Sequence, residues 1–447
     1  MADGLMKKIA VIGSGISGLS AAWLLSQNHD VTLFEKDDRL GGHSNTVEVD
    51  GQFIDTGFIV YNQLNYPNLV AFFEHLDIST QPTEMSFSAS LDGGRLEYAG
   101  TSLAGLFAQK ANLLKPAYWG MIRDILKFYR NAPSVLEHAA TEHWTLRELL
   151  RSGGYGRAFI HNHLLPMGAA IWSTPTEDML DYPAAAFIRF CQNHGLLQIS
   201  DRPEWRTVTG GSRQYVDRIG DILAGAVRLN SSVAAVHTDK SGVLVECRNG
   251  HIQQFDDALF ATHADQALAL IADPTPAHKK LLGSFAYEKN LAILHCDASL
   301  MPKRRKAWAS WNYLGATNKD AGKEDLSVTY WMNRLQNLKS DKDYFVTLNP
   351  AIEPKDGSVL RSFPYDHPLF DNAAIAAQKM LWNLQGQKNL WFCGSYFGYG
   401  FHEDGIQSGL AVAEALGGDL RPWQVDASRS RIYLPKDATG ASFAKVA

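Results

Sequence analysis

Short apolar runs alternate with helical patterns from the start of the chain. The first apolar run is Lys8–Ile12, a helical pattern follows over Leu19–Ser26, and a second apolar run covers Asp30–Glu35. A buried strand, a helix and a second strand within about 30 residues form a βαβ unit. This part of the chain predicts an α/β fold with a parallel sheet.

The pattern changes twice further along. Helical patterns rich in aromatic residues dominate from Tyr66 to about Cys191, strands then recur, and the chain after Leu420 is predicted to be a surface tail. The later strands are expected at Ala226–Leu229, Val233–His237, Val243–Arg248, Ala258–Ala261, Asn290–His295, Ala307–Tyr313, Ser327–Met332, Tyr344–Leu348 and Leu390–Cys393, and later helices at Tyr215–Ala224, Asn372–Trp382 and Gly405–Leu416. We interpret this order as two interleaved domains, one formed by 1–85, 206–285 and 386–447, the other by 86–205 and 286–385.

Composition narrows the class of protein. The 447 residues are 45% hydrophobic and 20% charged, which is typical of a globular chain with a large core. Lysine and arginine minus aspartate and glutamate give 42 − 47 = −5, so no basic bias suggests a nucleic-acid partner. Four scattered cysteines and 15 histidines form no metal-binding or disulfide pattern. We expect a cytoplasmic protein without a metal, and leave open a peripheral position at the inner face of the membrane.

A glycine-rich turn lies between the first strand and the first helix. Gly13, Gly15 and Gly18 fit the pattern GxGxxG, and Glu35 follows at the end of the next strand. The first glycine permits the tight turn, the second lets a pyrophosphate approach the helix N-terminus, and the third permits close packing of helix and strand. A carboxylate at Glu35 would accept hydrogen bonds from ribose hydroxyls. The turn predicts a dinucleotide site.

The residues after Glu35 indicate which dinucleotide is bound. Arg39, Gly41 and Gly42 give the pattern E-x3-R-x-G-G. This pattern resembles that of the FAD enzymes of the amine oxidase and phytoene desaturase superfamily. The resemblance implies a Rossmann-type FAD-binding domain with an interleaved α+β substrate domain, as in amine oxidases.

Further motifs carry the same resemblance. Asp55-Thr-Gly57-Phe58 is similar to the family's stretch along the isoalloxazine, and the strand ending near Val233 is similar to the one whose backbone contacts adenine. Gly394 with Glu403–Gly409 is similar to the C-terminal flavin motif. Cys393 precedes that motif, so the resemblance implies non-covalent FAD. The expected cofactor-binding residues are Gly13, Ser14, Gly15, Ile16, Ser17, Gly18, Glu35, Lys36, Arg39, Gly41, Gly42, His43, Thr56, Gly57, Phe58, Val233, Gly394, Glu403, Asp404 and Ile406.

The substrate is less well defined by the sequence. The chain resembles a bacterial group of flavin oxidoreductases associated with cyclopropane-fatty-acid-synthase-like methyltransferases, through motifs such as Trp308-Ala-Ser-Trp311 and Phe401–Gly409. That resemblance implies desaturation of a methylated or otherwise modified fatty acyl chain on the way to furan fatty acids. An amine or amino-acid oxidase that releases hydrogen peroxide is the alternative, and a non-enzymatic flavoprotein partner is a third. The electron acceptor stays open between oxygen, a quinone and another compound, and so does the oligomeric state.

Four residues are candidates for catalysis. His402 has a neutral-range pKa that suits a base, and Tyr61 follows the flavin-lining stretch. Lys289 or its neighbour Asn290 precedes a strand at the place where amine oxidases carry a lysine near the flavin.

One further stretch is a candidate for contact with a membrane. It is the amphipathic stretch Leu103–Trp119, which includes Lys110 and Lys115.

Overall fold

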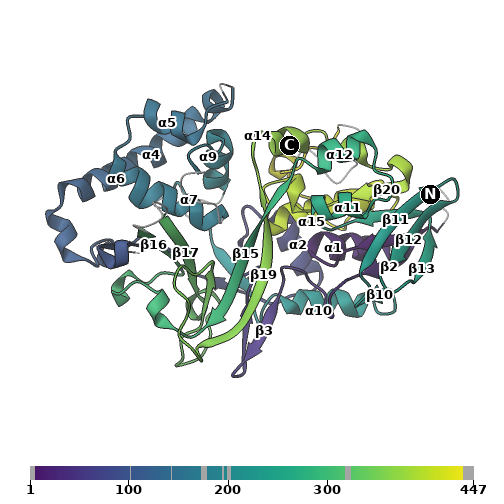
Figure 1. Cartoon of the computed structure of the whole chain (residues 1–447), viewed down its shortest axis with the longest axis horizontal. Coiled ribbons are helices and arrows are strands. Elements are labelled where there is room, and N and C mark those ends of the chain that lie inside the picture. Colours follow the sequence, from purple (N-terminus) through teal and green to yellow (C-terminus); the bar gives the residue numbers. More distant parts are fainter. Residues whose placement is uncertain are drawn as a thin grey trace.

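A computed structural model describes residues 6–100, 102–141, 143–172, 179–193, 196–198, 203–317 and 324–435. One end of the molecule is built on a five-stranded parallel sheet with the order β10-β2-β1-β14-β20 (Figure 1). Its strands are β1 (Lys8–Ile12), β2 (Asp30–Phe34), β10 (Val227–Arg228), β14 (Asp257–Phe260) and β20 (Leu390–Phe392). The predicted βαβ unit and the α/β class are confirmed.

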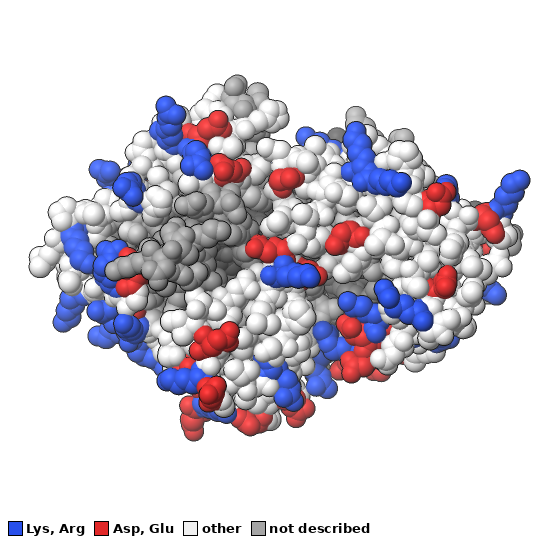
Figure 2. Space-filling model, viewed as in Figure 1, with Lys and Arg blue, Asp and Glu red and all other residues white. Residues whose placement is uncertain are grey.

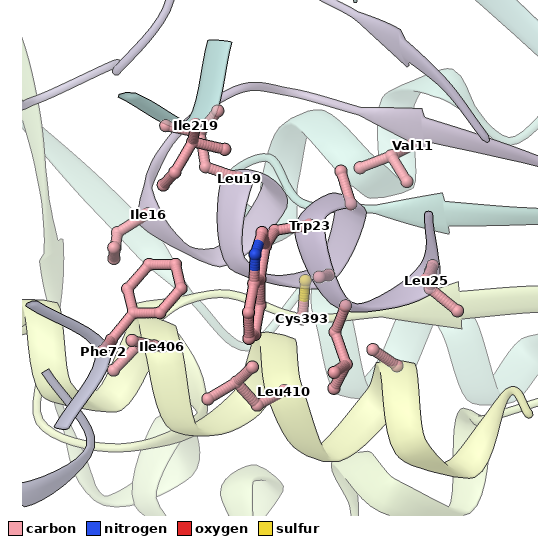
Figure 3. Close-up of a cluster of buried hydrophobic side chains, with 14 of the residues drawn as sticks. Val11, Ile16, Leu19, Trp23, Leu25, Phe72, Ile219, Cys393, Ile406 and Leu410 are labelled. Atoms are coloured by element: carbon pink, nitrogen blue, oxygen red, sulfur yellow. The ribbon is translucent and has the colours of Figure 1, made fainter. Parts of the chain in front are cut away.

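Two helices with small residues pack closely on this sheet. The helices α1 (Ile16–Leu25) and α15 (His402–Ala415) lie against each other, and α2 (Pro67–His75) and α10 (Arg213–Ile222) complete the same hydrophobic cluster. Figure 3 shows Trp23 of α1 extending toward Leu410 of α15, while Leu19 lies beside Ile219 of α10. Because all of α1 is buried, its apolar side chains surround the whole helix.

The other face of the parallel sheet is covered by a second cluster. It contains the antiparallel strands β11 (Val233–Asp239), β12 (Gly242–Cys247) and β13 (Ile252–Phe255), and the helices α11 (Ala264–Leu270), α12 (Pro276–Leu282) and α14 (Asn372–Gln378). Residues 370–384, which we expected in the second domain, contribute Phe370, Ala374 and Leu381 to this cluster. The proposed domain boundaries stay an interpretation.

A seven-stranded mixed sheet forms the middle of the molecule. Its order is β19-β15-β18-β17-β16-β7-β8, and the long strands β15 and β19 lie between the parallel sheet and the helical end (Figure 1). The strands are β7 (Phe87–Leu91), β8 (Leu96–Ala99), β15 (Ala286–His295), β16 (Trp311–Thr317), β17 (Glu324–Trp331), β18 (Phe345–Leu348) and β19 (Val359–Leu369). A short helix, α13 (Met332–Leu335), follows β17.

Helices at the far end pack around a separate hydrophobic cluster. They are α4 (Pro116–Thr141), α5 (Leu146–Ser152), α6 (Arg157–Phe159), α7 (Leu165–Trp172) and α9 (Ala184–Asn193).

Two small antiparallel sheets complete the fold. One is the hairpin of β3 (Thr46–Val49) and β4 (Gln52–Asp55), and the other has the strand order β5 (Tyr61–Asn62), β9 (Trp205–Val208), β6 (Thr80–Thr83). Among the described residues, no helix is long and apolar enough to cross a bilayer.

Four expectations about local structure are wrong. Residues 80–99, expected within the helical region, form β6, β7 and β8. The strand expected at Ala307–Tyr313 begins only at Trp311, after a 3-10 turn (η5, Arg305–Ala307) in which the Arg305 guanidinium lies 3.8 Å above the Trp308 ring. Leu103–Trp119 is not one amphipathic helix but α3 (Leu103–Leu106), a 3-10 turn (η2, Lys110–Leu114) and the start of α4.

The predicted surface tail is the fourth. Arg421 is buried, its guanidinium pairs with Glu414 at 2.7 Å, and it donates to Asn68 Oδ1 at 2.9 Å. Trp423 stacks on Trp23 of α1, with ring centroids 5.9 Å apart. The described part of the tail therefore packs over α1 and α2.

Candidate functional site

The glycine turn forms a cradle at the N-terminus of α1. Gly13 has φ +101°, and a Cβ on Gly18 would lie 1.9 Å from the Gly13 carbonyl oxygen, so both positions require glycine. A Cβ on Gly15 would meet nothing within 4 Å, so this backbone faces open space. A Cβ on Gly42 would lie 3.3 Å from the Gly15 Cα. The two glycine turns thus face each other and leave backbone accessible to a flat, negatively charged ligand.

Glu35, the expected ribose-binding acid, lies beside the first glycine turn. It follows β2 and is buried beside the turn, where its carboxylate accepts hydrogen bonds from the amides of Ser14 (3.0 Å) and Asp37 (3.0 Å). The Ser14 hydroxyl donates to the same carboxylate. Lys36 is exposed next to it. A carboxylate can accept about four hydrogen bonds, so a ribose hydroxyl can join these donors.

Arg39 binds the protein rather than pointing away from it. Its guanidinium donates to the carbonyl oxygens of Gly42 (2.9 Å), Leu40 (3.2 Å) and Ser44 (3.4 Å). Arg39 therefore holds the second glycine turn in shape. The Gly41 amide adds a hydrogen bond to the Ser14 carbonyl oxygen at 3.0 Å, which ties this turn to the first.

The N-termini of α1 and α15 lie side by side. A Cβ on Gly405 would lie 2.8 Å from Ile16 Cγ2, and one on Gly409 would lie 2.4 Å from the Ser17 carbonyl oxygen. Further along, a Cβ on Gly418 would contact Leu25 at 3.4 Å, so the two helices run in the same direction. Both positive helix ends face the same region, which favours a ligand with several negative charges.

The two acids at the start of α15 have structural partners. Glu403 accepts from the amides of Asn68 (3.1 Å) and Leu69 (3.0 Å), and so caps the N-terminus of α2. Asp404 accepts from the Phe401 amide at 2.8 Å and lies 3.8 Å from the Arg431 guanidinium. Burial raises the pKa of both carboxyls. The expectation that they bind FAD stays untested, and the contacts shown here are with protein.

Residues 56–58 continue the lining beside the second glycine turn. A Cβ on Gly57 would lie 2.1 Å from the His43 carbonyl oxygen, and the Phe58 amide donates to that oxygen at 2.8 Å. The Thr56 hydroxyl lies 2.8 Å from the Tyr365 hydroxyl of β19. This stretch therefore joins the glycine turn to the mixed sheet.

His402 lies at the N-terminus of α15. Its ring stacks on the Phe58 ring with centroids 3.6 Å apart, and its Nε2 atom lies 2.9 Å from Ser44 Oγ and 3.1 Å from Tyr215 Oη. Enclosure by these groups lowers the pKa of His402 to about 3. The imidazole is therefore neutral at pH 7, with one nitrogen held by hydroxyl groups.

A second group of rings lies between the glycine turns and the mixed sheet. The ring of His43 lies 6.0 Å from His263, 5.9 Å from His367 and 4.9 Å from Tyr365. His263 stacks on Tyr287 at 4.4 Å. We call His43, His263 and His367 the histidine cluster. Loss of contact with water lowers the pKa of each histidine, to about 4 for His367.

The histidine cluster borders the dinucleotide cradle. His43 follows Gly42, and His263 follows Thr262, whose Cγ2 would lie 3.2 Å from a Cβ on Gly13. Among the described residues, the buried Nδ1 atom of His263 has no hydrogen-bond partner. An unsatisfied buried nitrogen beside two positive helix ends fits a pyrophosphate oxygen as partner. The residues present therefore fit a dinucleotide.

The structure separates the remaining catalytic candidates. Asn290 is buried, and its Nδ2 atom lies 3.2 Å from His367 Nδ1, which connects it to the histidine cluster. Lys289 is exposed and paired across the strands with Asp366, so it lies on the other face of β15. Tyr61 packs in the core against Phe73, with ring centroids 5.5 Å apart.

Three cofactor candidates fall into supporting positions. The Ser231 amide donates to the Glu35 carbonyl oxygen at 2.8 Å, which brings β11, the strand that begins at Val233, close to Glu35. The Gly394 amide donates to the Ser408 hydroxyl at 3.0 Å, so it fixes the start of α15. Ile406 is fully buried between α15 and α1.

Sequence reasoning missed His263, His367, Tyr365 and Tyr287. His263 could have been found, because the end of a strand next to the glycine turn lies at the ligand-binding edge of a parallel sheet. Tyr365 and His367 belong to β19, whose prolines hide the strand pattern. The described residues hold no group of three or more side chains placed to bind a metal ion.

Comparisons with known proteins agree with this geometry. Residues 16–334 match the family of flavin-containing amine oxidoreductases, and the chain belongs to this family. FAD is therefore the cofactor of the site. When bound, FAD supplies a hydride acceptor at the flavin N5 atom.

Two relatives are named for different activities. A Mycobacterium tuberculosis protein with the name of a flavin-containing monoamine oxidase (AofH) is 26% identical over 284 residues, which is 61% of this chain and 57% of AofH. A 4,4'-diapophytoene desaturase of Staphylococcus aureus is 36% identical over 103 residues, 18% of this chain and 20% of the desaturase. The chain thus spans less than two thirds of the length of either relative.

Solved structures share the fold. A fatty acid isomerase from P. acnes superposes with a TM-score of 0.64 and 13% identity, over 92% of this chain and 98% of that one. Putrescine oxidase bound to putrescine gives 0.66 and 16%, over 92% and 99%, and cyclohexylamine oxidase from Brevibacterium oxydans gives the same values. The expected amine-oxidase-like architecture is confirmed.

Proposed function

We propose that the protein is an FAD-dependent dehydrogenase that desaturates a hydrophobic substrate, a methylated or otherwise modified fatty acyl chain. Family membership supports flavin-dependent oxidation, and the desaturase relative supports removal of hydrogen from an apolar chain. In this reaction two neighbouring carbons lose a hydride and a proton. The hydride goes to the flavin, and the proton goes to a base on the protein or in water.

The choice of substrate rests on one observation: the carboxylates around the site already accept hydrogen bonds or form ion pairs within the protein. Asp55 accepts from the Ser212 amide at 2.9 Å and from Gln336 Nε2 at 2.9 Å. Glu403 and Asp404 are bound as described above. These three acids are occupied by the protein's own donors, while His402 and Phe58 present neutral rings. Such a lining suits an uncharged chain better than an ammonium group.

The catalytic residues form part of the proposal. His402 is the candidate closest to the flavin motif, and its low pKa makes the neutral imidazole a weak base and a good orienting group. Asn290 joins the histidine cluster through His367. Tyr61 and Lys289 stay candidates from sequence alone, since Tyr61 lies in the core and Lys289 at the surface.

An amine oxidase is the second candidate function. It is favoured by the AofH relative. Anaerobic mixing of the FAD-loaded protein with acyl lipids and with amines separates the two functions, because only a true substrate bleaches the flavin absorbance. FAD that neither class reduces would point to the non-enzymatic alternative. If FAD is bound non-covalently, denaturing the protein should release the yellow flavin into solution.

A further inference from the structure

We propose that the surface formed by α3, η2 and the start of α4 docks on a bilayer that contains anionic lipids. Four large apolar side chains project from this surface: Leu103 is 77% exposed, Leu114 87%, Trp119 49% and Leu113 46%. They lie within 17 residues of each other in sequence. We call these four residues the apolar patch.

The local structure holds the apolar patch outward. The Trp119 indole donates from Nε1 to the Leu113 carbonyl oxygen at 2.9 Å, so the indole is fixed over η2. Tyr118, the preceding residue, is buried and anchors α4, and its hydroxyl donates to the Leu106 carbonyl oxygen. The buried Asn112 accepts from Lys115 Nζ at 3.0 Å. These hydrogen bonds fix η2 and the start of α4 in a conformation that leaves the leucines exposed.

The segment that bears the apolar patch carries basic side chains. Residues 100–123 contain Lys110, Lys115 and Arg123 and no aspartate or glutamate, and Arg123 pairs with the following residue, Asp124, at 3.1 Å. The helix α3 also contacts η5, which lies in the basic run Lys303–Lys306. Figure 2 shows Lys and Arg side chains gathered along the edge of the molecule at this end, although the whole chain carries a net charge of −5.

The basic run is only partly neutralised by the protein. Arg304 pairs with Glu97 at 2.7 Å, and Arg305 pairs with Asp343 at 2.9 Å. Lys303 and Lys306 are exposed, and neither has an ion pair with a described residue. These two lysines and Lys110 are thus available to anionic headgroups.

Leucines and a tryptophan beside free lysines match the chemistry of a membrane interface. Apolar side chains enter the boundary between headgroups and acyl chains, indole favours that boundary, and lysines contact anionic headgroups. The inference extends the proposed function, because a bilayer is where acyl chains are held. Binding to vesicles needs no turnover, so either proposal can fail without the other.

Vesicle flotation of the full-length, FAD-loaded protein tests this surface. The probes are vesicles of phosphatidylcholine alone and vesicles with 30% phosphatidylglycerol, at ~50 mM and ~300 mM salt. We expect the protein to float with the anionic vesicles at low salt and to dissociate at high salt. The variant Lys110→Glu/Lys306→Glu is expected to bind at least about 25-fold more weakly, at about fivefold per lysine. Leu103→Gln/Leu114→Gln is expected to lose at least about tenfold.

Matched variants outside the apolar patch and the basic run serve as controls. Ile252 on β13 and Leu420 after α15 are 54% and 53% exposed, and Lys240 and Lys379 are exposed lysines (Figure 1). Ile252→Gln/Leu420→Gln and Lys240→Glu/Lys379→Glu should bind like the unchanged protein. All variants should keep the same thermal midpoint, since only exposed side chains change. No binding to anionic vesicles, or equal binding by patch and control variants, would overturn the proposal.

Discussion

The ring of His43 stacks on the ring of Tyr365, with centroids 4.9 Å and planes 29° apart. His43 follows the second glycine turn, and Tyr365 belongs to β19 of the mixed sheet. The Tyr365 hydroxyl also lies 2.8 Å from Thr56 Oγ1. This stack joins the second glycine turn to the sheet that carries Asn290.

We expect the histidine cluster to make FAD binding dependent on pH. Without ligand, limited contact with water lowers the pKa of His43, His263 and His367. The diphosphate of FAD raises the pKa of nearby histidines, so binding takes up protons and becomes tighter as the pH falls. We expect the dissociation constant of FAD to decrease from pH 8 to pH 6, by up to about tenfold per pH unit for each proton taken up.

Fluorescence titration of the FAD-free protein measures this dependence. His263→Gln should give a flatter dependence and weaker binding at pH 6. The control His237→Gln changes an exposed histidine on β11 and should leave the curve unchanged. A dissociation constant that is the same at pH 6 and pH 8 would show that the cluster does not meet the diphosphate.

The close contact of α1 with α15 requires Gly409. Gly409→Ala would place a Cβ 2.4 Å from the Ser17 carbonyl oxygen and would push the helices apart. We expect a loss of about 1–3 kcal/mol in the free energy of unfolding and at least about tenfold weaker FAD binding, because the two positive helix ends separate. The control is Gly120→Ala in α4, where a Cβ meets nothing within 4 Å. Urea unfolding and FAD titration report both effects; equal behaviour of the two variants would contradict the packing argument.

Glu403 is expected to stabilise the fold more than it binds FAD. Glu403→Leu removes the acceptor for the Asn68 and Leu69 amides and should cost about 2–4 kcal/mol in the free energy of unfolding. Glu403→Gln keeps one acceptor and should cost less. Urea unfolding measures both. If folded Glu403→Gln lost FAD affinity more than about twofold, the carboxylate would have a role at the cofactor instead.

Two histidines far from the cofactor predict sensitivity to acid. Burial lowers the pKa of His163 and of His295 to about 4, whereas the unfolded chain protonates near 6.5. The unfolded state therefore binds more protons between these values, and stability is lost as the pH falls below 6.5. We expect each histidine to reduce the free energy of unfolding by about 2 kcal/mol between pH 7 and pH 5. Urea midpoints measured on His163→Gln should fall less steeply over this range than those of the unchanged protein.

The N-terminal unit was predictable because its signals are local. Gly13, Gly15, Gly18 and Glu35 have the spacing of a known sequence pattern. In the structure the three glycines form the turn at the N-terminus of α1, and Glu35 lies beside that turn. The strand β19 was not predictable, since Pro364 and Pro368 are tolerated only because it is an edge strand. Whether a strand lies at the edge depends on the order of the strands in the assembled sheet, which the local sequence pattern does not contain.

The functional roles of charged residues were the hardest to predict. Arg39 and Glu403 were expected to bind FAD, which stays a prediction. The sequence did not indicate that the Arg39 guanidinium also donates to three carbonyl oxygens around its own turn. Nor did it indicate that Glu403 caps α2, more than 330 residues earlier in the chain. Such partners depend on tertiary contacts that no local spacing contains.

The proposed dehydrogenation is tested most directly by anaerobic reduction of the bound flavin. The FAD-loaded protein is mixed without oxygen with methylated acyl phospholipids, the corresponding fatty acids, and a panel of amines, while the flavin absorbance is followed. The account predicts bleaching by an acyl substrate, with a product two mass units lighter because one double bond has formed. Bleaching by amines alone, or no bleaching by any acyl compound, would contradict it.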